Sequence, residues 1–376
     1  MTTTSYWLDE LAPEPARPRR GGRPEVLVVG GGVTGCACAL RLAEEGIRVR
    51  LHDARTVAGG ASGRNGGFAL RGAAVPYDRL VRQVGAEPAR RLMKLTERGL
   101  DRLEQLAGDA FRRVGSLRLA HDDDELQELR AEHDALARDG FAVEWVDELP
   151  QPLARLYRGA ILHPPDGSIH PARWVRRLAA HAAGAGAEIV EESRVEAEVA
   201  AREADAVVVA TDGYTAGALP ELAGVVVPTR GQVLATEPLS ECRYGRPHYA
   251  RGGYDYWHQL PDGRLVLGGQ RDASPDTELT EAEETTPLIQ GRLEALAREL
   301  TGCEVRVTHR WSGIWGTTPD GLPLVGPVPG RERTWIAAGY SGHGNVLGLV
   351  CGSLLADMIL GRAVDETALL DPARFG

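Results

Sequence analysis

Uninterrupted apolar runs predict a parallel sheet in this chain. Residues 26–29, 206–210 and 335–338 are such runs, and a glycine follows each within three residues. Strands that are buried on both faces of a parallel sheet show this continuous pattern, whereas half-exposed strands alternate. Helical periodicity at 174–183 and a short strand at 187–190 continue the alternation of strand and helix. We therefore predict an α/β sheet that is assembled from segments far apart in the chain.

A second pattern fills residues 225–317, where short apolar–polar alternations replace the continuous runs. Strands are predicted at 225–227, 232–236, 265–268 and 305–309, with a turn at 261–264 and a helix near 286–300. Earlier in the chain, helices are predicted over 77–107 and 123–138, a strand at 116–120 and a turn at 166–171. Alternation of this kind is typical of antiparallel strands with one solvated face. The pattern thus predicts a second, antiparallel domain.

Residues 25–53 hold the most specific chemical signal. Gly30, Gly32 and Gly35 have G-x-G-x-x-G spacing directly after the first apolar run. In such a motif the first glycine permits a tight turn, the second lets a pyrophosphate approach the backbone, and the third lets the helix pack on the sheet. Asp53 ends the next apolar strand, at the distance where an acid accepts hydrogen bonds from ribose hydroxyls. The segment predicts binding of FAD or NAD; the alternative is a structural βαβ unit.

Two further glycine-rich stretches follow predicted strands. Residues 58–67 come after the strand that Asp53 ends, and residues 339–344 come between the last apolar run and a predicted helix at 345–360. Backbone N–H groups in such loops and at a helix start can contact an anionic or electron-rich group closely. We expect both stretches to face the dinucleotide, although a flexible loop at 58–67 is the alternative.

Composition narrows the chemistry. The net charge is −10, with acids and bases interspersed, which argues against nucleic acid as the main partner. Lys94 is the only lysine and lies in a charged helical stretch, so Schiff-base or P-loop lysine chemistry is not expected. No metal site is predicted, because Cys36 and Cys38, at i and i+2 on a helix, point to different faces. They fit better as small buried residues.

The expected location is cytoplasmic. Five scattered cysteines suggest no disulfide framework and suit a reducing compartment. We see no signal peptide in residues 1–24 and no apolar stretch long enough for a membrane span. Tyr6 and Trp7 are unusual in a disordered tail, so we expect this arm to dock on the body of the protein or on a partner.

Aromatic residues gather in the predicted antiparallel domain. They are Tyr249, Tyr254, Tyr256, Trp257, Trp311 and Trp315. An antiparallel sheet that carries aromatic side chains and lies over a cofactor would form a substrate pocket. An ordinary aromatic core is the alternative for each residue.

These motifs together resemble the D-amino acid oxidase-type FAD-dependent oxidoreductases, in particular the glycine/sarcosine oxidase-like and gamma-glutamylputrescine oxidase-like members. The matching stretches are 5–9, 30–35, 60–67, 210–214, 230–232, Trp311 with 318–323, and 339–344. The resemblance implies an α/β fold with a Rossmann-type FAD-binding domain like that of glutathione reductase. An α+β substrate domain built on an antiparallel sheet would be inserted into it.

The same resemblance implies a division of the chain. Residues 1–24 would be an N-terminal arm. Residues 25–76, 157–222 and 318–376 would form the discontinuous FAD-binding domain, and 77–156 and 223–317 the substrate domain.

The resemblance also implies which residues bind FAD. Gly30, Gly32 and Gly35 would hold the pyrophosphate, Asp53 the ribose and Val195 the adenine. The full expected set is Gly30, Gly32, Val33, Thr34, Gly35, Asp53, Ala54, Arg55, Gly60, Ala61, Ser62, Arg64, Asn65, Gly66, Gly67, Val195, Ala210, Thr211, Gly213, Gly342, His343, Gly344, Asn345 and Val346.

The implied reaction is hydride transfer from an amine or amino acid to FAD, which gives an imine that hydrolyses. The substrate pocket would contain Tyr254, Tyr256, His258, Trp315 and Tyr340, with His343 beside the flavin. Arg230 and Arg271 are candidate partners for a substrate carboxylate, although arginines on strand ends are more often surface residues. The helix after residue 344 would stabilise negative charge on the reduced flavin.

Three positions depart from the pattern of sarcosine-type oxidases. Gly313 stands where they have a cysteine that tethers the flavin, which implies non-covalent FAD. Val266 stands where they have a lysine that activates oxygen, so oxygen or another electron acceptor is open. Val346 stands where they have a lysine that binds carboxylate, which favours an amine with its charge elsewhere over a small α-amino acid.

Other functions also agree with these motifs. A flavin dehydrogenase that does not use oxygen, or an FAD-binding subunit of a complex with the arm as its partner contact, would share all these motifs. An NAD-dependent dehydrogenase would share the fingerprint but would leave the 339–344 turn unexplained.

Overall fold

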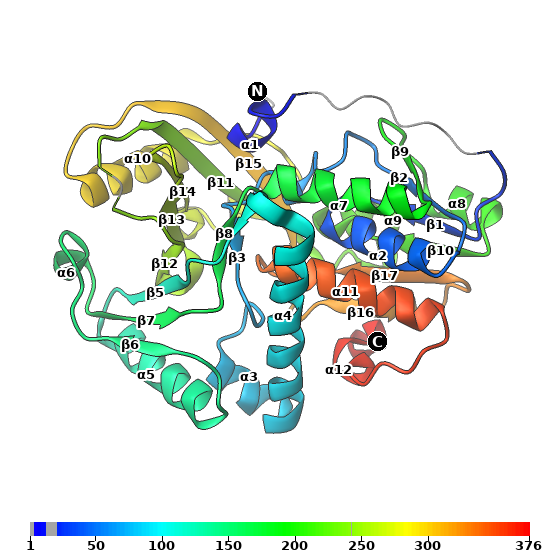
Figure 1. Ribbon diagram of the computed structural model, residues 1–376, viewed down its shortest axis with the longest axis horizontal. Coiled ribbons are helices and arrows are strands. Elements are labelled where there is room, and N and C mark those ends of the chain that lie inside the picture. The colour runs from blue at the N-terminus through cyan, green and yellow to red at the C-terminus, as the bar shows by residue number, and fades with distance from the viewer. Residues whose placement is uncertain (1–3, 13–20, 242) are drawn as a thin grey trace.

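The computed structural model describes residues 4–12, 21–241 and 243–376, without the side chain of Thr367. Figure 1 shows two lobes side by side, each built around its own sheet, with the long helix α4 (Ala86–Ala107) between them. None of the helices in the described ranges is long and apolar enough to cross a membrane.

A six-stranded sheet forms the first lobe. Its strand order is β16 (Leu324–Pro327), β17 (Thr334–Ala338), β10 (Ala206–Val209), β1 (Val26–Val29), β2 (Val49–His52) and β9 (Glu188–Val190). All neighbours are parallel except β16 and β17. The sheet is therefore assembled from three separate regions of the chain, 26–52, 188–209 and 324–338, as the continuous apolar runs predict.

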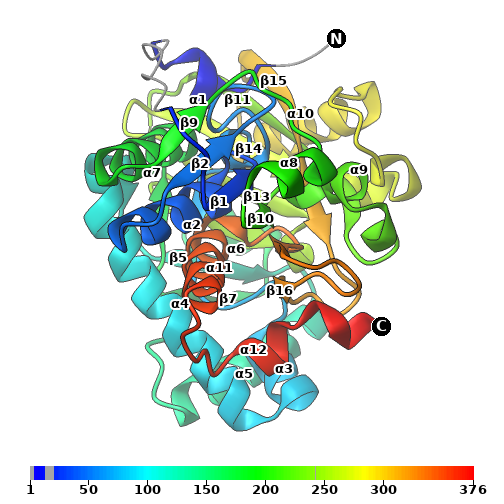
Figure 2. The same cartoon turned by 90° about the vertical axis from the view of Figure 1, so that its right-hand side faces the viewer.

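Both faces of this sheet are covered. Val26 and Val28 of β1 pack into a core with α2 (Val33–Glu44), α7 (Pro171–Ala185) and α11 (Gly344–Ile359). Leu27 and Val29 point to the opposite core, which includes α8 (Ala197–Glu203). A strand that is buried on both sides needs apolar residues at every position, which explains the uninterrupted run. Figure 2 shows α2 and α11 next to each other on the covered face, where they are in contact.

An eight-stranded sheet forms the second lobe. Its strand order is β15 (Val307–Thr317), β11 (Val227–Pro238), β14 (Arg264–Gly269), β13 (Asp255–Gln259), β12 (His248–Ala250), β5 (Ser116–Ala120), β7 (Gly159–His163) and β6 (Glu144–Val146). Only β12 and β5 pair in parallel. Helix α10 (Pro287–Thr301) packs on β11 and β14, and α5 (Asp123–Arg138) packs on β5 and β7.

Smaller elements complete the fold. A three-stranded sheet contains β3 (Phe68–Ala69), β8 (Gly167–Ile169) and β4 (Phe111–Arg112). The remaining α-helices are α1 (Tyr6–Asp9), α3 (Tyr77–Val84), α6 (Leu153–Leu156), α9 (Thr215–Ala218) and α12 (Thr367–Leu370).

Several sequence expectations differ from the structure in detail. The single helix expected over 77–107 is two helices, which Gly85 separates with φ of 88°. The strand expected at 225–227 and the one expected at 232–236 largely merge into β11, and the strand at 305–309 extends to Thr317 as β15. The turn expected at 166–171 contains β8, and β6, β7, β12, β13 and β16 were not expected. Most of these are short strands, which long-range pairing defines rather than local pattern.

One expected boundary also shifts. Residues 157–163 were assigned to the FAD-binding domain, yet β7 pairs with β5 and β6 in the larger sheet. This stretch therefore belongs with the second lobe.

Candidate cofactor and substrate site

A cavity of about 650 Å³ lies where the two lobes meet. Val29, His52 and Ala210, at the carboxyl ends of β1, β2 and β10, line it from the first lobe. Gly231 of β11 and Trp315 of β15 line it from the second. Cavities of this size at the carboxyl edge of a parallel sheet are the usual sites for small ligands in α/β proteins.

The turn between β1 and α2 requires its glycines. Gly30 has φ of 113°, and a Cβ atom there would lie 2.4 Å from the Ala210 carbonyl oxygen. A Cβ atom at Gly35 would lie 1.9 Å from the Gly30 carbonyl oxygen. The N-cap residue of α2 is Gly32, which has no side chain to cap the helix, and Ser62 Oγ accepts a hydrogen bond of 3.0 Å from the N–H of Val33 at its first position. The helix therefore presents its positive dipole end and its backbone N–H groups to the cavity.

Asp53 is held in place by the backbone. One carboxylate oxygen accepts a hydrogen bond of 2.6 Å from Gly31 N–H, and the other accepts one of 2.7 Å from Arg55 N–H. Burial raises the pKa of Asp53, and these two N–H groups oppose the increase. Each oxygen can accept a second hydrogen bond, which suits a ribose hydroxyl.

The loop 61–67 is fixed by hydrogen bonds to three successive carbonyl groups. Ser5 Oγ donates to Gly63 O at 2.7 Å, Trp311 Nε1 donates to Arg64 O at 2.8 Å, and Trp7 Nε1 donates to Asn65 O at 2.8 Å. All three donor residues are fully buried. The first two donors come from the start of α1 and the third from β15. The loop 61–67 is therefore positioned by two segments that are far apart in the sequence.

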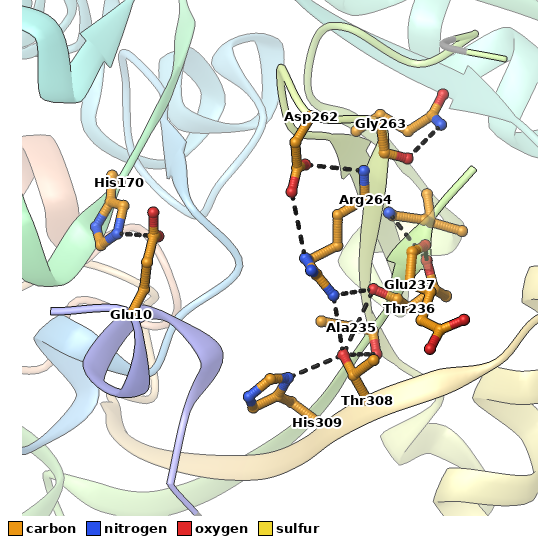
Figure 3. A network of polar contacts seen from close by, with 12 residues as sticks. Glu10, His170, Ala235, Thr236, Glu237, Asp262, Gly263, Arg264, Thr308 and His309 are labelled. Carbon is orange, nitrogen blue, oxygen red and sulfur yellow. Dashed lines mark hydrogen bonds and ion pairs between the residues drawn. The ribbon is translucent and has the colours of Figure 1, made fainter. Parts of the chain in front are cut away.

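Polar contacts also attach the N-terminal arm to both lobes. Glu10 accepts a hydrogen bond of 2.9 Å from His170 Nε2, at the start of α7, and Asp9 contacts His309 Nε2 of β15 at 3.2 Å. Figure 3 shows the Glu10–His170 contact and the neighbouring polar network of Arg264, Thr308 and His309. Residues 5–10 of the arm thus dock on the body of the protein, one of the two outcomes that Tyr6 and Trp7 suggested, and residues 1–3 and 13–20 of the expected arm lie outside the described residues.

The start of α11 faces the same cavity. Its N-cap residue is His343, and no side chain caps it. Asn345 Nδ2 donates to Asn65 Oδ1 at 3.1 Å and to Phe68 O at 2.7 Å. The hydroxyl groups of Tyr340 and Thr34 are hydrogen bonded at 2.8 Å, which connects this helix start to that of α2. Two helix N-termini therefore converge on one cavity.

His343 is neutral at physiological pH. Burial lowers its pKa to about 4, and the charge of Arg118 lowers it further while Glu132 opposes. Among the described residues, its Nδ1 atom has no hydrogen-bond partner. A neutral imidazole can accept or donate a hydrogen bond but cannot supply a positive charge to the site.

Four aromatic side chains form what we call the aromatic wall of the cavity. They are Tyr249, Tyr256, Trp315 and Tyr340. Glycines make room for two of them: a Cβ atom at Gly231 would lie 2.2 Å from the Trp315 ring, and one at Gly268 would lie 2.4 Å from the Tyr256 hydroxyl oxygen. The small residues of β11 and β14 therefore decide where these rings lie.

Asp212 connects two strands beneath the cavity. Its side chain accepts hydrogen bonds from Gly316 N–H at 3.0 Å and Gly339 N–H at 2.8 Å. Burial raises its pKa to about 6 despite these N–H groups. It lines the cavity and belongs to the 210–214 stretch that carries the family resemblance, while its partners lie on segments more than 100 positions away.

This combination of fold and cavity is shared with known proteins. The family model for DAO, FAD dependent oxidoreductases, matches residues 25–358. This chain belongs to that family. The chain is also 30% identical to a probable oxidoreductase OrdL of Rhizobium meliloti strain 1021, over 96% of this chain and 89% of that protein. It is 28% identical to gamma-glutamylputrescine oxidoreductase of Escherichia coli strain K12, over 90% of this chain and 84% of that protein.

Solved structures show the same fold. The crystal structure of glycine oxidase from Geobacillus kaustophilus has a TM-score of 0.72 at 24% identity, covering 93% of this chain and 98% of that one. This DAO-family protein is therefore an FAD-dependent oxidoreductase with the expected α/β fold.

The cavity of this DAO-family protein fits FAD. Two helix N-termini whose N-cap residues supply no capping side chain, a turn that requires glycine and a fixed acidic acceptor all lie around it. Thr211 Oγ1, which has no partner among the described residues, adds a free hydrogen-bonding group. Bound FAD would supply the acceptor for a hydride, which carries the two electrons of the oxidation.

Most of the expected cofactor residues line the cavity. They are Gly30, Gly32, Val33, Thr34, Asp53, Ala54, Arg55, Gly60, Ala61, Ser62, Arg64, Asn65, Gly66, Val195, Ala210, Thr211, Gly342, His343, Gly344 and Asn345. The other four, Gly35, Gly67, Gly213 and Val346, do not line it. Gly35 and Gly213 allow close backbone packing, and Val346 is buried in the core beside α4. Their effect on the cavity would be indirect.

Only some of the residues expected in the substrate pocket line the cavity. Tyr256, Trp315, Tyr340 and His343 line the cavity, but Tyr254 and His258 do not. His258 is buried behind it, against the rings of Trp7 and Phe68. Tyr249 and Arg271 line the cavity but were not among the expected catalytic residues. The aromatic clustering in the sequence already pointed to Tyr249.

The two arginines expected as partners for a substrate carboxylate, Arg230 and Arg271, lie in different environments. Arg230 is fully buried and forms a 2.8 Å ion pair with the equally buried Glu278, so its charge is already compensated. Arg271 lines the cavity. Only Arg271 therefore remains a candidate.

Proposed function

We propose that this protein oxidises a carbon–nitrogen single bond of an amine or amino acid to an imine, which water hydrolyses to a carbonyl compound and an amine. The observation that carries the proposal is the aromatic wall, which shares one cavity with the dinucleotide fingerprint and the start of α11. Apolar, aromatic surfaces exclude water and favour the neutral amine, the form that can lose hydride. The names of the gamma-glutamylputrescine and glycine relatives support this substrate class.

Specific residues have proposed positions in this reaction. The α2 N-terminus would hold the pyrophosphate of FAD, Asp53 the ribose and Val195 the adenine, all through groups that line the cavity. The α11 N-terminus would stabilise negative charge at the redox ring. The pKa of His343 is lowered to about 4, so its imidazole is too weak a base to hold the proton of a substrate ammonium, and that proton would leave to solvent.

One finer point concerns how the cofactor is held. Gly313, where a tethering cysteine would lie in sarcosine-type oxidases, lines the cavity and has no group to form a covalent bond. We therefore propose non-covalent FAD, which acid precipitation should release completely into the supernatant.

A dehydrogenase that passes electrons to an acceptor other than oxygen is a second candidate. Val266 is buried in β14 and does not line the cavity, and Lys94, the only lysine, lies exposed on α4. No lysine ammonium is therefore available beside the flavin to attract oxygen.

The deciding experiment is an anaerobic screen of the purified yellow holoenzyme against amines and D- and L-amino acids, with flavin bleaching as the readout. We expect bleaching by at least one amine. A protein that cannot be loaded with FAD, or a flavin that no amine in a broad panel bleaches, would refute the proposal. Hydrogen peroxide production in air then separates the two candidates, and the dehydrogenase predicts slow reoxidation by oxygen.

A further inference from the structure

One segment of the second lobe reaches the first lobe at the edge of the cavity. It consists of residues 278–286, between β14 and α10, and we call it the strap. One fully buried side chain fixes both of its ends: Gln232 Nε2 donates to Glu278 Oε1 at 3.0 Å, and Gln232 Oε1 accepts from Thr286 N–H at 2.9 Å. Arg230 adds a 2.8 Å ion pair with Glu278. These two residues of β11 therefore anchor the strap.

Between its anchors, the strap contacts the first lobe through Glu283. The Glu283 carboxylate forms ion pairs with Arg55 at 2.5 Å and with Arg64 at 3.6 Å, and it accepts a hydrogen bond from the Tyr214 hydroxyl. The Arg55 guanidinium also lies 5.1 Å from the centre of the Tyr214 ring. We call these four residues the Glu283 cluster. They connect segments that follow β2 and β10 of the first lobe to the second lobe.

The Glu283 cluster lies at the edge of the cavity. Arg55, Arg64 and Tyr214 line the cavity, whereas Glu283 does not. The side chain of Arg55 is 38% exposed, but those of Arg64 and Glu283 are only 12% and 13% exposed. Partly buried ion pairs with additional hydrogen bonds are stronger than exposed pairs, because water and salt screen them less. The cluster can therefore hold the two lobes together at this edge.

Glu283 also allows two arginines to lie close to each other. Burial lowers the pKa of Arg64, the charge of Glu283 opposes this decrease, and the charge of Arg55 adds to it. Without the carboxylate, the two guanidinium groups would repel each other, and their side chains would separate. Glu283 therefore decides where two of the charged side chains of the cavity lie.

We propose that Glu283 retains the cofactor, because FAD can enter or leave the cavity only when Glu283 releases Arg55 and Arg64 and the strap moves away. Glu283 is a positioning residue in this proposal, since it acts through the two arginines that line the cavity. The proposal depends on the binding of FAD, which the family shows, and does not require that the substrate is an amine.

Release of FAD from the holoenzyme tests the role of Glu283. Flavin fluorescence would be followed after dilution, and rebinding of FAD to the apoprotein would be followed in the same way. In Glu283→Gln both steps should be faster, release by about tenfold, because a charge-assisted cluster of hydrogen bonds no longer has to open. Faster release with slower rebinding would refute the proposal, because that combination indicates a damaged cavity and not an easier opening.

Glu281→Gln is the matched control. Glu281 lies on the same strap and lines the cavity, but it forms no ion pair among the described residues. The substitution removes the same charge and leaves the Glu283 cluster intact, so the release rate should change by less than about threefold. If Glu281→Gln speeds release as much as Glu283→Gln does, charge alone explains the effect and the proposal is wrong.

Two milder variants cover the case in which Glu283→Gln does not fold. Tyr214→Phe removes only the hydroxyl that donates to Glu283, so release should be about threefold faster than in wild type. Glu283→Asp keeps the charge but shortens the side chain by one methylene group, which should also speed release. If neither variant releases FAD faster than wild type, Glu283 does not retain the cofactor. These measurements need no amine, so they decide the role of Glu283 even if the proposed function fails.

Discussion

Individual residues shape this cavity mainly through the absence of side chains. Gly231 and Gly313 are paired across β11 and β15, and the Trp315 ring occupies the space above Gly231. Gly268 leaves room for the Tyr256 hydroxyl in the same way. The aromatic wall therefore depends on glycines in strand interiors, where glycine otherwise weakens a sheet.

The substitution Gly231→Ala tests this dependence. The new methyl group would overlap the Trp315 ring, so the indole must move. We expect kcat/KM for the best amine to fall at least tenfold, because small displacements of a positioning group have large effects on rate. FAD binding should remain near the wild-type value, as measured by release of flavin fluorescence.

The control for this variant is Gly291→Ala. Gly291 lies on α10 with no heavy atom within 4 Å of the added Cβ position. If Gly231→Ala and Gly291→Ala retain the same kcat/KM, Trp315 does not form part of the substrate site.

At the scale of elements, the N-terminal arm is more than a linker. Ser5 and Trp7 bind two carbonyl groups of loop 61–67, and Trp311 of β15 binds the carbonyl between them. The loop's position is thus decided by the start of a four-residue helix and by a strand 247 positions further along the chain. Preorganisation of this kind lowers the entropy that ligand binding would otherwise cost.

Trp7→Phe tests the arm. The change keeps an aromatic ring in the buried position but removes the indole N–H that binds Asn65 O. One such hydrogen bond contributes about 1 kcal/mol, so the dissociation constant of FAD should rise about fivefold. Measurement of released flavin fluorescence on dilution checks this value.

Trp145→Phe serves as the comparison, because Trp145 lies on β6 outside the cavity. It should leave the affinity for FAD unchanged. Equal affinities of the two variants would show that the arm does not act on the cofactor loop.

At the scale of the whole molecule, burial keeps several histidines neutral. The pKa of His248 is lowered to about 3 and that of His258 to about 4, in both cases mainly by burial. His163 is lowered well below its usual value for the same reason, and His343 to about 4. The unfolded chain takes up protons on these residues below about pH 6.5, but the folded protein does not.

The protein should therefore lose stability as the pH falls from 7.5 towards 5. At pH 5.5 each such histidine favours unfolding by about 1.4 kcal/mol. Burial also raises the pKa values of Asp166 and Asp212 to about 6 and those of Asp53 and Asp255 by less, and these acids act in the opposite direction. The four histidines, together with His170, whose pKa is also lowered, outweigh them. Urea unfolding of the holoenzyme should show a lower midpoint at pH 5.5 than at pH 7.5. A midpoint that stays constant or rises would contradict this balance.

Local sequence was sufficient for the cofactor-binding half of the protein. The apolar runs, Gly30, Gly35 and Asp53 are constrained by backbone geometry and burial over a few residues, so their roles can be inferred from order and spacing alone. The same reason made the helices at 123–138 and 286–300 predictable within a residue or so at each end.

Only the tertiary structure decided the substrate half. Arg230 and Arg271 have the same chemistry and similar positions near strand ends, but Glu278 neutralises one and aromatic rings orient the other. Likewise, His258 and Tyr256 are two residues apart, yet only Tyr256 reaches the cavity. Contacts between distant segments determine which charge is compensated and which ring is exposed to a ligand, and no local pattern encodes those contacts. The sequence by itself thus determined that this protein binds a dinucleotide, whereas the packing of the two lobes decided which side chains line the cavity.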